Sequence, residues 1–319
     1  MAELRLGVNL WSQASDWPSF LRAGQRADEL GYDHLWTWDH VLAIFGAPDQ
    51  PIFEGYTALA ALAQATAHAR LGLFVGANTF RNPGLVAKAV TTIDHISGGR
   101  AMLGLGGAWF ETEHRAFGLE FGSGFGQRLD WLAEAVPAVR SLLDGDEVTS
   151  APGGRYAFDH LRILPRPVQA HVPVVIGGGG ERKTLAIVAR HADMWNVFGT
   201  PETVAHKNEI LRRHCDEAGR DESAIERSVG CKVTIRETEA EATRVLKATL
   251  AHNRTPESSV ADDASFWTGT PEQIAETMQR YRDVGFDTFI VELAAPYDDE
   301  TMTSLVEVVR PMLDGVRPA

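Results

Sequence analysis

Two adjacent residues, Asp39 and His40, have side chains suited to proton transfer and stand where a strand is expected to end. The preceding segment, residues 34–38, is short and largely apolar, which predicts a buried strand. A histidine titrates near neutral pH and can pass protons to or from a ligand at such a position. His40 is therefore a candidate catalytic residue, and Asp39 is predicted to orient it or to cap the loop. The alternative is a histidine that only hydrogen-bonds within the strand-end loop.

A run of four glycines, Gly177, Gly178, Gly179 and Gly180, forms the end of a second apolar segment that begins at residue 173. Glycines let the backbone approach a ligand closely, and the free N–H groups at the start of a helix favour an anion. A helix is expected to open at Glu181, with positive charge from Arg182 and Lys183. The run is thus predicted to bind a phosphate, although no Gly-Lys-Ser/Thr follows it. The alternative is a flexible loop.

Glycine and aromatic residues also follow the apolar segment 101–105, where Gly107, Ala108 and Trp109 stand in sequence. Parallel α/β proteins place their binding sites at strand ends of this kind. Asn196 lies in a further strand-like segment, 193–197, and its amide could hydrogen-bond the polar edge of a ring. These residues are predicted to line the same site.

Eight predicted strands that alternate with helices position these residues. The strands are expected at 4–10, 34–38, 71–75, 101–105, 173–177, 193–197, within 224–235 and at 287–293. The helices are expected at 17–30, 57–69, 86–96, 128–143, 181–191, from 201, at 239–250, from 271 and at 301–313. Residues 144–172 break the rhythm, and the Gly153-Gly154 pair within them predicts a hairpin insertion before the fifth strand.

This alternation predicts an α/β fold, a (β/α)8 TIM barrel that forms a single domain over residues 1–319. An open, doubly wound sheet is the alternative fold. It would place Gly-x-Gly-x-x-Gly after the first strand, and the chain has no such motif there.

The composition limits the classes of function. The net charge of −13 argues against a nucleic-acid or anionic-membrane surface. Two cysteines are too few for a disulfide framework, and the start of the chain lacks a secretion signal pattern, so a cytoplasmic protein is expected. A metal is not expected, because Asp39, His40 and Glu292 fall near strand ends without a tight ligand spacing. No Gly-x-Ser-x-Gly motif indicates a serine hydrolase.

Segments near residues 34–40, 71–118, 173–197 and 269–293 resemble, in order and spacing, the luciferase-like monooxygenase superfamily. Within it the chain is similar to the branch that uses the deazaflavin coenzyme F420, at Asp39-His40, at the turn 79–83, at 109–118 and at the glycine run. The resemblance implies an oxidoreductase that transfers a hydride between F420 and a small organic substrate, with His40 beside the cofactor ring. It also implies a homodimer.

The resemblance implies two further features of the site. A cis peptide bond on the third strand, between Phe74 and Val75, is expected to form a bulge that supports the ring. Related deazaflavin sugar-phosphate dehydrogenases place an acid at the position of Gly107, from which this chain departs. Glu111 or Glu113 could reach into the site instead, but both are expected at the surface or in salt bridges.

Two other functions remain open on the same fold. One is an FMN-dependent monooxygenase, because a flavin activates oxygen whereas the deazaflavin, with carbon in place of N5, does so poorly. The other is a barrel that binds a flavin or deazaflavin without catalysis. Fold alone does not decide among them.

Overall fold

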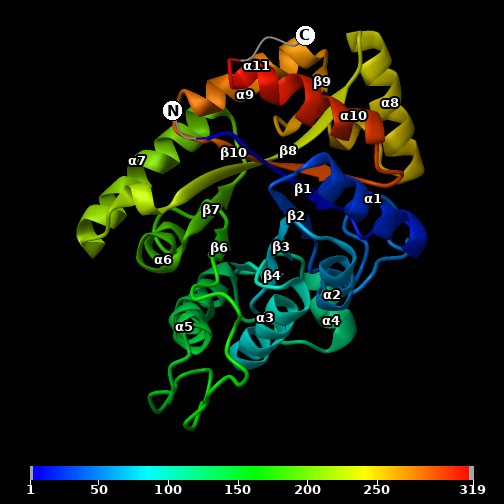
Figure 1. The fold of residues 1–319 in the computed structure, drawn as a ribbon. Helices are drawn as coiled ribbons and strands as arrows, with labels where there is room; N and C mark the ends of the chain where they lie inside the picture. Colours follow the sequence, from blue (N-terminus) through cyan, green and yellow to red (C-terminus); the bar gives the residue numbers. More distant parts are fainter. Residues whose placement is uncertain (1–2, 316–319) are drawn as a thin grey trace.

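Parallel strands form a nearly closed barrel in a computed structural model that describes residues 3–315 (Figure 1). The hydrogen-bonded order is β3-β2-β1-β10-β8-β7-β6-β5-β4, and β9 pairs with β8 outside this path. Since only Phe74 and Val75 separate β3 from β4, the path begins and ends at one place in the chain. The predicted barrel is confirmed. The strands are β1 (Arg5–Leu10), β2 (His34–Thr37), β3 (Arg70–Leu73), β4 (Gly76–Ala77), β5 (Leu103–Gly106), β6 (Val174–Gly177), β7 (Met194–Val197), β8 (Glu226–Ile235), β9 (Phe266–Gly269) and β10 (Thr288–Leu293).

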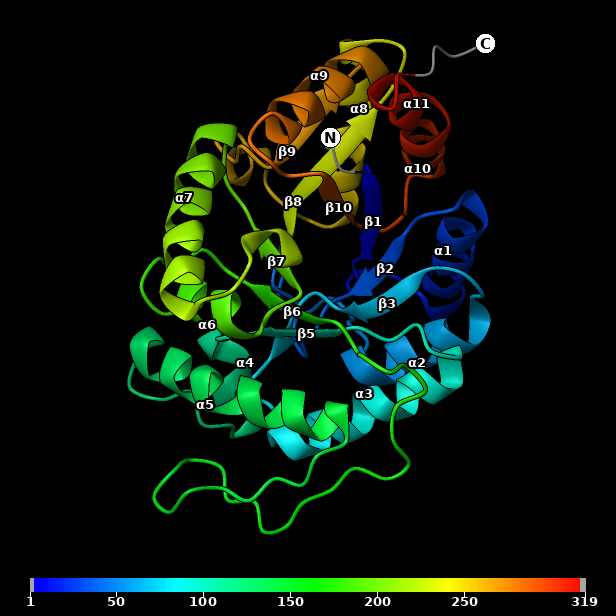
Figure 2. The ribbon, with the colours of Figure 1, turned by 60° about the vertical axis from the view of Figure 1, so that its left-hand side comes forward.

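Helices surround the barrel, and several begin at caps that the sequence specifies (Figure 2). Asp16 accepts a hydrogen bond from the Ser19 N–H at the start of α1, and Thr270 forms a capping box with Gln273 at α9. The α-helices are α1 (Trp17–Leu30), α2 (Gly55–Ala65), α3 (Pro83–Ser97), α4 (Glu111–Phe117), α5 (Phe125–Asp144), α6 (Thr184–His191), α7 (Pro201–Ala218), α8 (Glu239–His252), α9 (Pro271–Arg282), α10 (Asp299–Ser304) and α11 (Arg310–Leu313). Short 3-10 segments are η1 (Glu222–Ala224) and η2 (Glu257–Ser259), and η3 (Leu305–Val309) is a π-helical segment.

The third strand is interrupted at the peptide bond between Phe74 and Val75, which is cis as the resemblance implies. The Val75 side chain lies against two glycines of neighbouring strands. A Cβ atom on Gly106 or on Gly177 would stand 2.8 Å from the Val75 Cγ2 atom. Glycines at the ends of β5 and β6 therefore make the space in which Val75 sits.

The hairpin insertion before the fifth barrel strand is present between α5 and β6. Its arms join through reciprocal hydrogen bonds between Val148 and Leu161 and one from the Ser150 N–H to the Phe158 carbonyl. Figure 2 shows this segment as a long loop that extends beyond α5 and α3. Pairing is confined to a single bridge, so the insertion is more irregular than a strand pair.

Several element boundaries differ from those expected. Helix α2 spans residues 55–65, not 57–69, because the Glu54 carboxylate caps its start and Asp28 accepts from the N–H groups of residues 67–69. Helix α6 begins at Thr184, not at Glu181, since glycines disfavour helix formation. The short helix α4 and strand β9 were not expected. Among the described residues, no helix has the length and hydrophobicity to cross a membrane.

Candidate functional site

A cavity of about 490 Å³ opens at the C-terminal ends of the barrel strands. Most of the predicted site residues line it, although their positions in the sequence are far apart. They are Asp39, His40, Phe74, Val75, Gly107, Ala108, Trp109, Gly177, Gly178 and Asn196. The predicted residues Gly179 and Gly180 are not among its lining residues.

His40 is held in the cavity by a carboxylate from α4. Its Nδ1 atom lies 2.9 Å from Oε1 of Glu113, and the Val41 N–H donates to Oε2 of the same carboxylate at 3.1 Å. An ionised carboxylate only accepts, so the Nδ1–H tautomer of a neutral ring suits this contact and leaves Nε2 as an acceptor. Of the two alternatives expected for Glu113, the surface or a salt bridge, the structure shows the second, because Glu113 is almost completely buried and pairs with His40.

Helix α4 is fixed to the turn after β4, which sets the position of Glu113. The buried His114 on this helix contacts the Thr79 hydroxyl through Nε2 at 2.6 Å and the Phe110 carbonyl through Nδ1 at 2.9 Å. The sequence offered little indication of a buried Glu113, because a seven-residue helix with acidic residues at its start and basic residues at its end is typical of an exposed helix. His40 and Glu113 thus form a hydrogen-bonded pair of titratable side chains in the cavity.

Asp39 has a positioning role next to His40. Its carboxylate accepts from the Ala77 N–H at 2.8 Å and from Nη1 of Arg81 at 2.9 and 2.8 Å. Burial disfavours the charged guanidinium, but the carboxylates of Asp39 and Glu54 outweigh it and raise the pKa of Arg81. Asp39 thus ties the end of β2 to β4 and to the turn that follows, and it does not contact His40 through a hydrogen bond.

Three aromatic side chains that line the cavity are about half exposed. Trp109, Phe125 and Phe198 are 59%, 51% and 44% exposed, although all three line the cavity. Val75 lies deeper, between Gly106 and Gly177. Aromatic rings with exposed faces and an aliphatic residue below them are suited to hold a planar ring.

The glycine run has a more divided role than predicted. The Gly178 N–H donates to the Asn196 carbonyl at 2.9 Å, and the Trp195 indole donates to the Gly178 carbonyl at 2.9 Å. Within residues 3–315, the N–H groups of Gly179 and Gly180 have no hydrogen-bond partner. Among the described residues, the N–H groups without a partner are therefore in the second half of the run, which follows the two glycines that line the cavity.

The cation nearest this run comes from α7. The Lys207 ammonium donates to the Gly179 carbonyl at 2.7 Å and lies 3.4 Å from the Glu181 carboxylate. Lys183, which the sequence suggested, instead donates to Asp130 at 2.6 Å. Lys207 was missed because it is 28 residues from Gly179 and its helix meets the run only in the folded chain.

Asn196 is buried beneath the cavity wall and is turned toward β8. Its Nδ2 atom donates to the Ser228 hydroxyl at 3.1 Å. This bond fixes the amide, so the Asn196 side chain has one of its two N–H groups engaged within the barrel.

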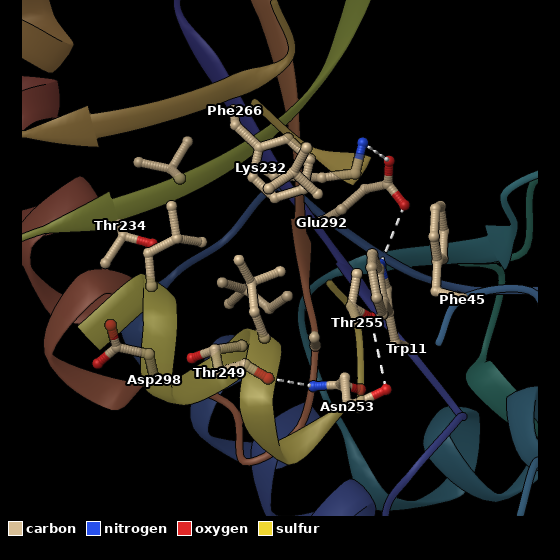
Figure 3. A pocket seen from close by; sticks show the side chains of 16 residues that line it. Trp11, Phe45, Lys232, Thr234, Thr249, Asn253, Thr255, Phe266, Glu292 and Asp298 are labelled. Carbon is tan, nitrogen blue, oxygen red and sulfur yellow. Dashed lines mark hydrogen bonds and ion pairs between the residues drawn. The ribbon is translucent and has the colours of Figure 1, made fainter. Parts of the chain in front are cut away.

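A second polar cluster lies at the ends of β8 and β10. The Glu292 carboxylate accepts at one oxygen, Oε2, from the indoles of Trp11 and Trp38 at 3.0 and 3.3 Å, and Lys232 lies 3.5 Å from the other oxygen. Figure 3 shows Lys232, Glu292 and Trp11 in this arrangement. Sequence reasoning had not singled out Lys232. Among the described residues, no group of three or more His, Cys, Asp or Glu side chains could hold a metal.

A family model described as luciferase-like monooxygenase matches residues 4–288 of the chain. An uncharacterized protein of Mycobacterium tuberculosis is 30% identical over 168 residues, which are 53% of this chain and 58% of that protein. The chain thus spans little more than half the length of this relative. The pyrimidine monooxygenase RutA of Cronobacter sakazakii is 29% identical over 265 residues, or 81% of this chain and 69% of that protein.

Solved structures show the same fold at low sequence identity. An F420-dependent secondary alcohol dehydrogenase, in complex with an F420–acetone adduct, superposes with a TM-score of 0.82 at 18% identity, over 99% of this chain and 100% of the other. The monooxygenase RslO1 from Streptomyces bottropensis superposes with a TM-score of 0.79 at 22% identity, over 98% of this chain and 99% of the other. At these identities the likeness concerns the fold alone.

Proposed function

Because the chain belongs to the luciferase-like monooxygenase family, we propose that it is an oxidoreductase that transfers a hydride between coenzyme F420 and a small organic substrate. The observation that carries the proposal is the pair of His40 and Glu113 in the cavity. Oxidation of an alcohol releases a hydride from carbon and a proton from oxygen. A histidine with a free Nε2 atom is the group that takes this proton.

The carboxylate of Glu113 supports both directions of the reaction. It keeps the Nδ1 proton in place, which leaves Nε2 as the base, and it stabilises the imidazolium once Nε2 is protonated. In the reverse direction the imidazolium returns its proton to the oxygen of the product. The deazaflavin supplies the hydride chemistry when it is bound, and the protein supplies orientation and the proton.

The residues present fit a phosphorylated ring cofactor. The exposed rings of Trp109, Phe125 and Phe198 and the side chain of Val75 offer apolar contacts to the ring. The unpartnered N–H groups at Gly179 and Gly180 suit a phosphate, with Lys207 beside them. Arg182 is exposed near this point, and it is the remaining candidate for contact with the acidic tail of F420.

An FMN-dependent monooxygenase is the second candidate function. It is favoured by the similarity to a pyrimidine monooxygenase over 81% of the chain. A phosphate on either cofactor would use the same backbone N–H groups, so the glycine run does not separate the two. The base at His40 supports the hydride-transfer proposal, because oxidation of an alcohol releases a proton from oxygen.

Titration of the purified protein with F420 and with FMN, each oxidised and reduced, tests the proposal through fluorescence or calorimetric heat. We expect tighter binding of F420. A His40→Ala variant is the matched control, since it should bind F420 as the parent does and lose turnover. Preference for FMN with oxygen consumption would assign the monooxygenase function instead. Binding without turnover of a broad substrate panel would leave a non-catalytic barrel.

We also propose that the protein is a cytoplasmic homodimer. Support for self-association comes from apolar side chains on α3 and the adjacent insertion, where Leu85 and Leu164 are 66% and 68% exposed. Apolar surface that is not covered within one chain is typical of an interface. Light scattering of the parent and of Leu85→Asp tests this, and an unchanged monomeric mass in both would refute it.

A further inference from the structure

Lys232, at the end of β8, has hydrogen-bonding capacity that the fold does not use. Its side chain is 12% exposed, and Nζ donates to the Ser265 hydroxyl at 2.9 Å. The Glu292 and Asp263 carboxylates are farther, at 3.5 and 3.7 Å. An ammonium has three N–H donors, and within residues 3–315 one of them is satisfied at ordinary hydrogen-bond length, while the ring centroids of Phe266 and Phe198 lie 4.9 and 5.4 Å from Nζ. Lys232 therefore presents donors to the cavity that it lines.

The surroundings of Lys232 disfavour an anionic ligand. Burial would raise the pKa of Asp263, but hydrogen bonds from Ser265 and the charge of Lys232 outweigh burial and lower it. Glu292 is held in place by the Trp11 and Trp38 indoles. Two carboxylates thus face one ammonium, and the local charge is negative. A neutral oxygen can accept from Lys232, whereas a carboxylate or phosphate would be repelled.

Lys232 and His40 are separate polar positions in one cavity. The Trp38 ring lies between them, with its centroid 6.0 Å from the His40 ring and its Nε1 atom 3.3 Å from Glu292, which in turn contacts Lys232. In the sheet, β2 and β8 are separated by β1 and β10. A ligand that meets both positions has an apolar segment over Trp38.

A small side chamber behind Lys232 limits what extends past it. Phe45, Lys232 and Glu292 line both the main cavity and this chamber, which has a volume of about 50 Å³ and further apolar lining from Leu250 and Val260 (Figure 3). Since a water molecule occupies ~30 Å³, the chamber has room for about one or two carbon atoms.

We propose that Lys232 is a substrate-positioning residue for a neutral substrate with two oxygen functions: a hydroxyl or carbonyl that reacts beside His40, and a second uncharged acceptor oxygen that Lys232 holds. A short alkyl group, such as the methyl of a methyl ketone, follows the second oxygen into the side chamber. This inference rests on the proposed function, because it assigns the reacting oxygen to His40.

Binding of 5-hydroxypentan-2-one to the full-length protein, with and without F420, tests the inference by calorimetry. Its comparison ligands are pentan-1-ol, which lacks the second oxygen, and 5-hydroxypentanoate, which carries a charge. We expect the hydroxyketone to bind about tenfold more tightly than the alcohol, because one hydrogen bond to a charged group separates them. The carboxylate should bind more weakly than the hydroxyketone.

The Lys232→Met variant should lose the preference for the hydroxyketone and still bind pentan-1-ol as the parent does. If Lys232 had only a structural role, the variant would bind the hydroxyketone and pentan-1-ol more weakly to the same extent, and that result would overturn the inference. Tighter binding of 5-hydroxypentanoate than of the hydroxyketone would contradict the proposal that the substrate is uncharged. Lys207→Met is the matched control, since it should affect the cofactor and leave the preference unchanged. Failure of F420 to bind would count against the proposed function, which separates the two failures.

Discussion

A methyl group added at Gly106 tests whether the slot around Val75 holds the interrupted third strand. The Cβ atom of Gly106→Ala would stand 2.8 Å from the Val75 Cγ2 atom, about 0.6 Å short of ordinary contact at 3.4 Å. Valine is stiff at χ1, so it cannot turn aside without a rotamer change. Overpacking of this kind costs about 1–3 kcal/mol of unfolding free energy. We expect that loss, together with weaker F420 binding.

The effect of Gly106→Ala on the unfolding free energy should change sign when Val75 is replaced by alanine. In a Val75→Ala background, the methyl group that Gly106→Ala adds no longer meets the Val75 Cγ2 atom. Alanine should then stabilise the strand by about 0.5–1 kcal/mol relative to glycine. Urea unfolding of the four proteins gives the coupling energy directly, provided that the slopes are equal. An equal loss of stability in both backgrounds would refute the contact with Val75 as the reason for glycine at this position.

Three further predictions concern the site and its frame. Glu113→Gln should lower kcat about 10–150-fold, since a hydrogen bond to a charged group contributes about 1.5–3 kcal/mol, and it should have no further effect after His40→Ala in steady-state assays. Lys207→Met should weaken the binding of FMN or F420 about tenfold and leave the binding of riboflavin, which lacks the phosphate, unchanged. An equal loss of affinity for FMN and riboflavin in fluorescence titrations would exclude a contact between Lys207 and the phosphate. Asp28→Asn should destabilise the fold by about 1–3 kcal/mol at pH 7. Burial would raise the pKa of Asp28, but hydrogen bonds from the N–H groups of residues 67–69 outweigh burial and lower the pKa from 3.8. The difference in unfolding free energy between the parent and Asp28→Asn should therefore shrink as the pH falls below 3.8, and it should vanish below the pKa of the folded state. Denaturation curves at several pH values measure this difference.

The barrel could be predicted from the sequence because its signals are local. Strand β6 is a short apolar run closed by glycine, and α1 carries its own cap and stop at Asp16 and Gly31. Each such signal acts within a few residues, and eight repetitions of the pattern specify the architecture. Where a boundary was wrong, a partner distant in sequence decided it. Asp28, for example, ends α2 by binding backbone that follows the helix.

The chemistry of the site was less predictable, since its partners meet only in the fold. His40 was found because histidine after a strand is conspicuous, whereas Glu113, 73 positions away along the chain, was expected at the surface or in a salt bridge with no partner named. Lys207 and Lys232 carry no local pattern that distinguishes them from solvated lysines. Their roles follow from the contacts with the Gly179 carbonyl and with Ser265, which depend on the packing of α7 and on the pairing of β8 with β9.

The charge of the chain also has a structural consequence at the cavity. Because the chain has a net charge of −13, its overall electrostatic field does not attract a phosphorylated cofactor. The cations near the cavity are already matched by carboxylates, Arg81 by Asp39 and Lys232 by Glu292. These pairs fix side chains at the ends of the strands and leave little positive charge for an anion. Within residues 3–315 the N–H groups of Gly179 and Gly180 have no partner, and they are neutral donors, so we expect the backbone to contribute to phosphate binding beside Lys207.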